Sequence, residues 1–153
     1  MSEFRIEKVR QAVKLTLATG KQLSGEIFLQ PAARYRSGPQ HPAELFNEPE
    51  PFIPIAVDAE LLLVAKDQVM TVQFADDSAD TDSEGVEEEE ASVDVVFSDG
   101  SETGGQLRLE TRVERPRLLD FLNDDHQRFL TLRSPRGVIL INRRRIAQVR
   151  QRR

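Results

Sequence analysis

The chain of 153 residues contains no cysteine and no tryptophan, and it has a single tyrosine. The absence of cysteine excludes disulfides, thiolate metal sites and cysteine nucleophiles, and it is typical of proteins that work in a reducing cytoplasm. Long hydrophobic runs are also missing, because no apolar stretch approaches the roughly 20 residues that cross a bilayer. The charged N-terminus lacks the apolar segment of a secretory signal. We therefore expect a cytoplasmic protein without a membrane partner.

The motifs of common enzyme classes are missing as well. The chain has no G-x-S-x-G nucleophile turn and no glycine-rich phosphate loop. Its two histidines, His41 and His126, have no metal-ligand partner at helical spacing. The contiguous acidic run 87–90 does not match the spaced oxygen ligands of a calcium loop. We expect no catalytic residues, metal, cofactor or small-molecule substrate, and so a protein that binds rather than catalyses.

Charge is distributed unevenly along the chain, although its net value is only −5. Residues 1–75 carry a net charge of −1, residues 76–110 one of −12, and residues 112–153 one of +8. The segment 76–91 combines dense negative charge with almost no apolar residues, which predicts an exposed, flexible linker. This linker would join a first β repeat, residues 1–75, to a second, residues 92–153, which ends in an arginine-rich C-terminus.

Several segments resemble later segments in the same order, which predicts a tandem internal repeat. VKLTLATGKQLSGEIFLQ, residues 13–30, aligns with VDVVFSDGSETGGQLRLE, residues 93–110, at an offset of 80. FIPIAVDAELLLVAKDQVMTV, residues 52–72, aligns with FLTLRSPRGVILINRRRIAQV, residues 129–149, at an offset of 77. Between these blocks, ELFNE aligns with DFLND at an offset of 76. The alternative is that any two β-hairpins share such a pattern, but three blocks in one order favour a repeat.

The first block of each predicted repeat has the pattern of a β-hairpin. Apolar and polar residues alternate on both sides of Gly20 and of Gly100, which predicts half-buried strands joined by tight turns. Gly25 and Gly105 lie inside the second predicted strand of each hairpin. Glycine at such a place indicates a bulge, a bend or the close approach of another backbone.

The remainder of each repeat predicts a short helix followed by three strands. The helix would end at Asn47 in the first copy and at Asn123 in the second. The strands and buried apolar runs are expected at 52–57, 61–64 and 69–74, and at 129–133, 138–141 and 146–149. Phe52 and Phe129 are expected in the core. The predicted fold class is mainly β, with two tandem five-stranded barrel-like units, each with a helix between its second and third strands.

The order of these signals resembles the Sm-like family, whose members fold as five-stranded SH3-like small barrels. The first signature is similar to LTLATGKQLSGEIFL and VVFSDGSETGGQLRL, and the second to LLLVAKDQVMTV and VILINRRRIAQV. The resemblance implies a small barrel in each copy and makes RNA binding a possible activity. The stretch RPRLLDFLN also resembles a segment of uncharacterised bacterial proteins, a likeness that implies no function.

Two sets of polar residues are candidates for a binding site. The first is the arginine cluster of the C-terminal region, namely Arg143, Arg144, Arg145, Arg150, Arg152 and Arg153. Arginine suits carboxylates and phosphates, so the cluster either pairs with acidic groups of the chain or of a protein partner, or contacts nucleic acid. The second set is the repeat-equivalent pair Asn47 and Asn123, which would cap turns through their own backbone or lie in a binding groove. We expect a non-catalytic binding or scaffolding module whose basic C-terminal face engages an acidic partner or surface, or a self-associating protein; the alternative is an Sm-like nucleic-acid-binding protein.

Overall fold

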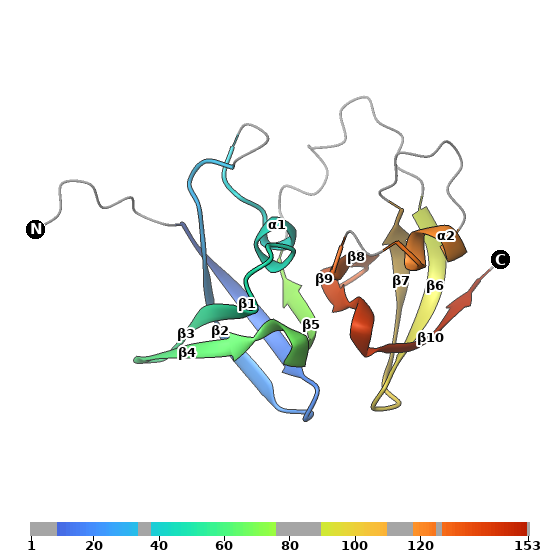
Figure 1. Ribbon diagram of the computed structural model, residues 1–153, viewed down its shortest axis with the longest axis horizontal. Helices are drawn as coiled ribbons and strands as arrows, with labels where there is room; N and C mark the ends of the chain where they lie inside the picture. The colour runs from blue at the N-terminus through green and yellow to red at the C-terminus, as the bar shows by residue number, and fades with distance from the viewer. Residues whose placement is uncertain (1–8, 34–37, 76–89, 110–117, 125–126, 153) are drawn as a thin grey trace, which may run out of the picture.

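The computed structural model describes residues 9–33, 38–75, 90–109, 118–124 and 127–152. These residues form one antiparallel sheet of ten strands, together with two short helices and two 3-10 turns. Figure 1 shows the sheet as two halves that lie side by side, the first coloured blue to green and the second yellow to red. The chain is therefore mainly β.

The first half begins at β1 and ends at β5. Its elements are β1 (Val9–Leu17), β2 (Gln22–Leu29), α1 (Pro42–Phe46), β3 (Phe52–Val57), β4 (Glu60–Ala65), the 3-10 turn η1 (Lys66–Gln68) and β5 (Val69–Phe74). The second half has the same order of elements. They are β6 (Glu90–Phe97), β7 (Glu102–Arg108), α2 (Leu118–Leu122), β8 (Phe129–Ser134), β9 (Gly137–Asn142), η2 (Arg143–Arg145) and β10 (Ile146–Gln151).

The acidic segment between the halves falls largely outside the described residues. Residues 76–89 of the predicted linker 76–91 are not described, and the last two residues of that range begin strand β6. The first half ends at Phe74 in β5, which lies in the middle of the sheet beside β9.

Glycine determines the shape of both hairpins. Gly20 and Gly100 adopt a φ of 90° in the β1–β2 and β6–β7 turns, a conformation that costs glycine little. A Cβ atom at Gly25 would lie 2.4 Å from the carbonyl oxygen of Ala56, and one at Gly105 would lie 2.5 Å from that of Arg133. Of the three alternatives, a bulge, a bend or a close backbone approach, the last applies at both glycines, because the backbone of the next strand lies against each.

The strand register is the same in the two halves. Val13 lies opposite Gly25 in the β1–β2 pair, and Val93 lies opposite Gly105 in the β6–β7 pair, at the offset of 80 found in the sequence. The β3–β4 and β8–β9 pairs also match residue for residue at the offset of 77. A bulge interrupts both the β1–β5 and the β6–β10 pairings at the equivalent place.

The order of strands across the sheet is β10-β6-β7-β8-β9-β5-β1-β2-β3-β4. Each half thus has the same internal order, and the halves are joined where β9 pairs with β5. The sheet is open, with β4 and β10 as its two edges, which lie on opposite sides of the molecule (Figure 1). The expectation of two closed barrels therefore becomes one continuous sheet, because β9 forms its second row of hydrogen bonds with the other half.

Two hydrophobic cores lie on opposite faces of this junction. On β9, Val138 and Leu140 belong to the core of the first half, whereas Ile141 belongs to the core of the second. On β5, Val72 faces the first core and Met70 the second. Because successive side chains of a strand point to opposite faces, both strands are buried on both sides and the halves share their cores.

Three side chains that we expected in the core are exposed instead. Phe52 is 58% exposed, Leu61 60% and Leu63 70%. The prediction of a buried run at 61–64 is therefore wrong for two of its residues, and so is the core prediction for Phe52. Phe129 is 1% exposed, as predicted. The physical reason is that these three side chains lie on the face of β3 and β4 that points away from the first core, and no described element covers that face.

Candidate functional site

The β5–β9 junction is the best-packed contact between the halves. Val72 lies opposite Leu140, and Phe74 lies opposite Val138, in an antiparallel pair. Val138 and Leu140 are 6% and 0% exposed, because β5 and the first core cover them. The junction shows how an apolar strand with this register is covered in this fold.

Asn47 attaches the end of helix α1 to the other half. Its side-chain amide donates to the carbonyl oxygen of Phe129 at 3.1 Å, and its Oδ1 accepts from the Phe129 backbone N–H at 2.8 Å. The ring of Phe129 also packs edge-to-face on Phe46, with centroids 5.2 Å apart. Asn47 therefore joins the two halves, since its side chain binds the backbone of a strand 82 residues away rather than its own turn; a role in a binding groove stays a prediction.

Asn142 and Lys66 are polar residues buried at the same junction. The Asn142 amide donates to the carbonyl oxygens of Val69 at 2.9 Å and Lys66 at 3.3 Å, and its Oδ1 accepts from the Arg144 N–H. The Lys66 ammonium donates to the carbonyls of Leu45 and Glu48 at the end of α1. Burial lowers the pKa of Lys66, an effect that nearby Glu48 partly opposes. These bonds satisfy the buried groups and fix how η1, η2 and α1 meet.

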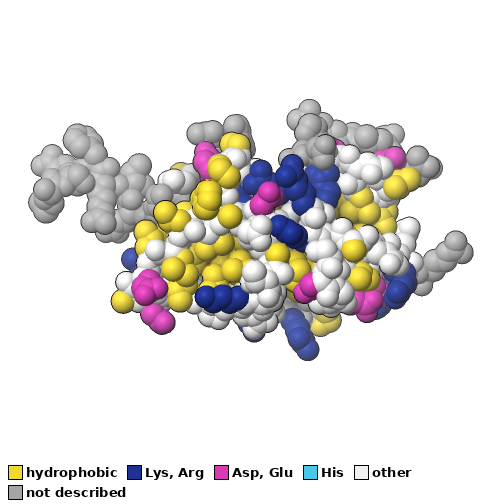
Figure 2. Space-filling model, turned by 60° about the horizontal axis from the view of Figure 1, so that its bottom comes forward, with side chains coloured by type: hydrophobic (Ala, Val, Ile, Leu, Met, Phe, Trp, Pro, Cys, Tyr) yellow, Lys and Arg dark blue, Asp and Glu magenta, His cyan; other side chains and the backbone are white. Residues whose placement is uncertain are grey.

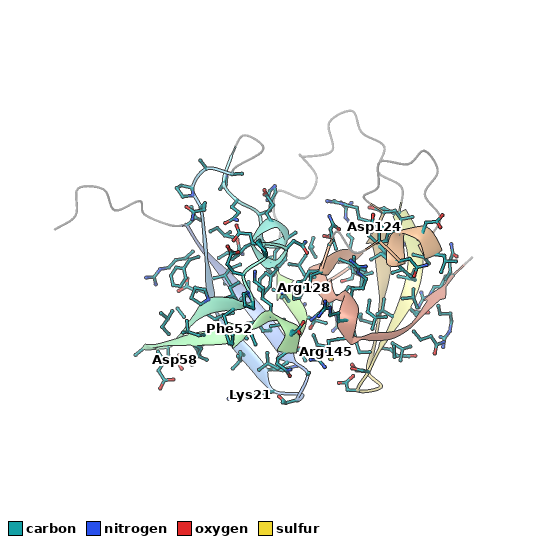
Figure 3. All side chains as sticks on the ribbon, viewed as in Figure 1. Lys21, Phe52, Asp58, Asp124, Arg128 and Arg145 are labelled. Atoms are coloured by element: carbon teal, nitrogen blue, oxygen red, sulfur yellow. The ribbon has the colours of Figure 1, made fainter. Side chains whose placement is uncertain are left out.

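The first three candidate arginines lie at this junction, in turn η2. Arg143 donates to the carbonyls of Gln127 and Leu122, and its counterpart Lys66 also donates to two backbone carbonyls near its helix, although not the equivalent ones. Arg144 forms an ion pair with the Asp67 carboxylate at 3.7 Å, and Arg145 donates to the Asp67 carbonyl at 2.8 Å. Figure 3 shows Arg145 between the two halves. The guanidinium groups of these arginines thus bind acceptors of the chain itself.

The remaining candidate arginines follow along β10. Arg152 donates to both carboxylate oxygens of Asp94, with an Nε–Oδ2 distance of 2.7 Å. Arg150 lies 3.9 Å from Asp94 and 4.0 Å from Glu102. The hydrogen bond from Arg152 lowers the pKa of Asp94 and raises that of Arg152. Arg153 lies outside the described residues.

Strands β3 and β4 carry three of the five large apolar side chains that are exposed among the described residues; the other two are Val9 in β1 and Leu119 in α2. Phe52 begins β3, opposite Ala65, and Leu61 and Leu63 project from β4. Figure 2 shows hydrophobic side chains gathered over the first half of the molecule, and Figure 3 places Phe52 on this edge. We call Phe52, Leu61 and Leu63 the β4 patch. Glu60 is the only charged residue in β4.

Proteins usually protect an edge strand with charge, proline, a bulge or short length. The six residues of β4 contain one charge and no proline, and their pairing with β3 runs without a bulge. The edge of β4 is therefore open to another strand, which can add through backbone hydrogen bonds to β4 and apolar contacts with the β4 patch.

The described residues contain neither a metal-binding cluster nor a membrane-spanning helix. Among them, no group of three or more potential metal-binding side chains occurs, and no helix is long and apolar enough to cross a membrane. His41 precedes α1, where its backbone N–H donates to the Glu44 carboxylate at 2.9 Å, and His126 lies outside the described residues. Comparison with family models, curated proteins and solved structures gives no match.

Sequence reasoning missed Asn142, Lys66 and the β4 patch. A signal for the patch was present, because Leu61-Leu62-Leu63-Val64 places apolar side chains on both faces of one strand. Such a strand must be covered on both faces or must lie at an edge that receives a partner. The partners of Asn142 and Lys66 are backbone carbonyls, which leave no trace in a sequence.

Proposed function

We propose that this chain is a non-catalytic assembly module that receives a β-strand from a protein partner at the edge of β4. The observation that carries the proposal is the exposure of the β4 patch on an unprotected sheet edge. Fully burying one Leu or Phe side chain contributes about 1.5–3 kcal/mol. Three such side chains on one edge therefore provide a substantial driving force for association.

We further propose that the module arose by duplication and works in the cytoplasm. Each half is proposed to be a copy of one Sm-like or SH3-like small-barrel unit, opened so that its fourth strand pairs outside its own unit. The common strand order and register of the halves support a duplication. The absence of cysteine favours a cytoplasmic location.

Binding of nucleic acid or an acidic partner through the arginines has less support. All of the described candidate arginines have acceptors within the chain, either carboxylates or backbone carbonyls. Aromatic side chains for base stacking are also missing after Phe129. The β4 edge is therefore the surface on which a partner is proposed to act.

A peptide selection tests this function. Random peptides displayed on phage are selected on the parent protein and on the variant Leu61→Glu with Leu63→Glu, whose altered side chains are exposed in the parent. Lys21→Glu, at the exposed β1–β2 turn, is a control with the same change in net charge. We expect extended peptides that bind the parent and Lys21→Glu, shift the β4 amide resonances in NMR spectra and do not bind the double variant. The proposal fails if no peptide is selected, or if the selected peptides bind the double variant equally well.

A further inference from the structure

We infer that the strand received by β4 is β10 of a second copy of this chain. The inference rests on the proposed function of β4 and names its partner. In strand order and register, β4 is the counterpart of β9, and β10 is the counterpart of β5. Within one chain β9 pairs with β5. The two edges that remain open, those of β4 and β10, are therefore the counterparts of two edges that pair with each other.

The β4 side of this contact has the side chains that the internal junction buries. Subtracting the offset of 77, Phe129, Val138 and Leu140 correspond to Phe52, Leu61 and Leu63. The first three are 1%, 6% and 0% exposed, and the second three are 58%, 60% and 70% exposed. The difference follows from the neighbouring half, since the core of the first half covers the former and no described element covers the latter.

On the β10 side, apolar side chains are less buried than their counterparts in the first half. In the first half, Phe46, Val69 and Val72 are fully buried in the core to which the second half contributes Phe129, Val138 and Leu140. Their counterparts in the second half are Leu122, Ile146 and Val149, which pack on the second core but are only partly buried. Both open edges thus expose apolar side chains whose counterparts the internal junction buries.

The internal register predicts the register between copies. Val72 lies opposite Leu140 and Phe74 opposite Val138 inside the chain. The corresponding intermolecular pairs are Val149 opposite Leu63 and Gln151 opposite Leu61. Continuing by one residue places Arg152 opposite Glu60, which are groups of opposite charge.

Asn123 completes the intermolecular contact. It follows α2 as Asn47 follows α1, its side chain is exposed, and it makes no side-chain hydrogen bond to a described residue. Asn47 binds both backbone groups of Phe129, whose counterpart is Phe52. We therefore assign Asn123 the backbone N–H and C=O of Phe52 in the neighbouring copy.

Such a contact joins two different surfaces, so it repeats from copy to copy until a ring closes or a filament forms. Each chain would contribute its own β5–β9 junction and one β10–β4 junction to the same continuous sheet. Closure would remove both open edges, which is the most complete protection of an edge strand.

Variants that block one edge each provide the test. The β4 variant is Leu61→Glu with Leu63→Glu. The β10 variant is Ala147→Glu with Gln151→Glu, because both side chains are exposed whereas their counterparts Met70 and Phe74 are buried in the internal junction. Lys21→Glu is again the control. The β4 variant, the β10 variant and Lys21→Glu all change the net charge of the chain by the same amount. Circular dichroism checks that each variant is folded.

The masses are measured by analytical ultracentrifugation over a concentration series. We expect the parent and Lys21→Glu to form species larger than the 17.4 kDa monomer, and each blocked variant to stay monomeric. An equimolar mixture of the two blocked variants should form a one-to-one dimer, because each retains the edge that the other lacks. Formation of this dimer also shows that both variants are folded.

Three results would overturn the inference: a parent that stays monomeric at every concentration, a mixture that stays monomeric, or a β10 variant that still self-associates. The last would indicate a symmetric β4–β4 contact. If the parent is monomeric but selected peptides still bind β4, the proposed function stands and only the second-copy partner is wrong. If neither peptides nor copies bind, both fail.

Disulfide trapping tests the register, since the chain has no cysteine of its own. Leu61→Cys in one chain and Gln151→Cys in another should cross-link on oxidation, because directly opposed residues bring their Cβ atoms within disulfide range. Leu62→Cys with Gln151→Cys is the control, with the thiols on opposite faces of the sheet. Equal cross-linking of the two pairs would overturn the register.

Discussion

Strands β9 and β4 have the same place in their halves, the same pairing to the preceding strand and similar apolar content. Leu140 of β9 is nevertheless fully buried, whereas its counterpart Leu63 of β4 is 70% exposed. The difference lies in the second neighbour, because β9 is flanked by β5 and β4 lies at the edge of the sheet. A strand with two apolar faces is thus a core element in one half and a partly exposed edge in the other, where we propose a binding surface.

The comparison also shows why the chain retains an apolar edge. Replacing Leu61 and Leu63 by charged residues would protect β4 from association, and nothing in the described first half requires their exposed side chains. Their apolar character is explained if another strand covers them, as β5 covers Val138 and Leu140. The open edge is therefore best understood as one half of an interface.

The largest effect that separates the two strands is expected from truncating their central leucines. Leu140→Ala removes a fully buried side chain and should lower the free energy of unfolding by about 2–5 kcal/mol. Leu63→Ala removes an exposed one and should change the unfolding free energy of the monomer by less than about 0.5 kcal/mol. Urea unfolding at low protein concentration measures both. Similar losses for the two variants would contradict the view that only β9 is covered within one chain.

Asn47 and Asn123, which follow α1 and α2, provide a second comparison between the halves. Asn47→Ala leaves the backbone groups of Phe129 without their partner and should lower the free energy of unfolding by about 1–3 kcal/mol. Asn123→Ala should change it by less than about 0.5 kcal/mol but weaken self-association about tenfold. Urea unfolding and sedimentation equilibrium measure the two effects. An Asn123→Ala variant that associates as well as the parent would remove the assigned contact to Phe52.

The smallest effect is expected from the ion pair between Asp94 and Arg152 of the second half. Asp94 binds Arg152, whereas the residues at the equivalent places of the first half are Lys14 and Ala75, which cannot form such a pair. Because Arg152 lowers the pKa of folded Asp94 below 3.8, the pair stabilises the fold fully above that pH. The stabilisation is lost as the pH falls through the lower folded pKa.

In Asp94→Asn, the free energy of unfolding should therefore fall less steeply than in the parent as the pH drops below about 4. Urea unfolding across this range measures the slope, and an NMR titration of the carboxyl groups gives the pKa directly. An Asp94 pKa at or above 3.8 would show that the hydrogen bond to Arg152 does not persist in solution.

Much of the local structure was predictable from the sequence. The strand at 52–57, the strand at 69–74 and the turns at Gly20 and Gly100 lie where alternation and glycine indicated. These features depend on residues close together in the chain, so a local pattern contains the necessary information. The exposure of Phe52 was not predictable in this way, because an aromatic residue at a strand start is compatible with either environment.

The candidate site was predicted less well, and the reason is the same in each case. The six arginines were chosen for their charge, but the acceptors of Arg144 and Arg145 lie in η1, far along the chain. Asn47 was chosen correctly as a notable residue, while its partner Phe129 came only from tertiary contact. Side-chain chemistry is local, but the groups that a side chain meets are determined by the topology.

The sequence by itself determined which residues form strands, which faces of them are apolar and where glycine must turn the chain, because these depend on side-chain alternation and backbone sterics. Only the tertiary structure decided which apolar faces are covered. β9 pairs with β5, and β4 is left at an edge, since covering a strand requires a neighbour from a distant part of the chain. The exposure of the β4 patch, and with it the binding role proposed for this protein, follows from that pairing.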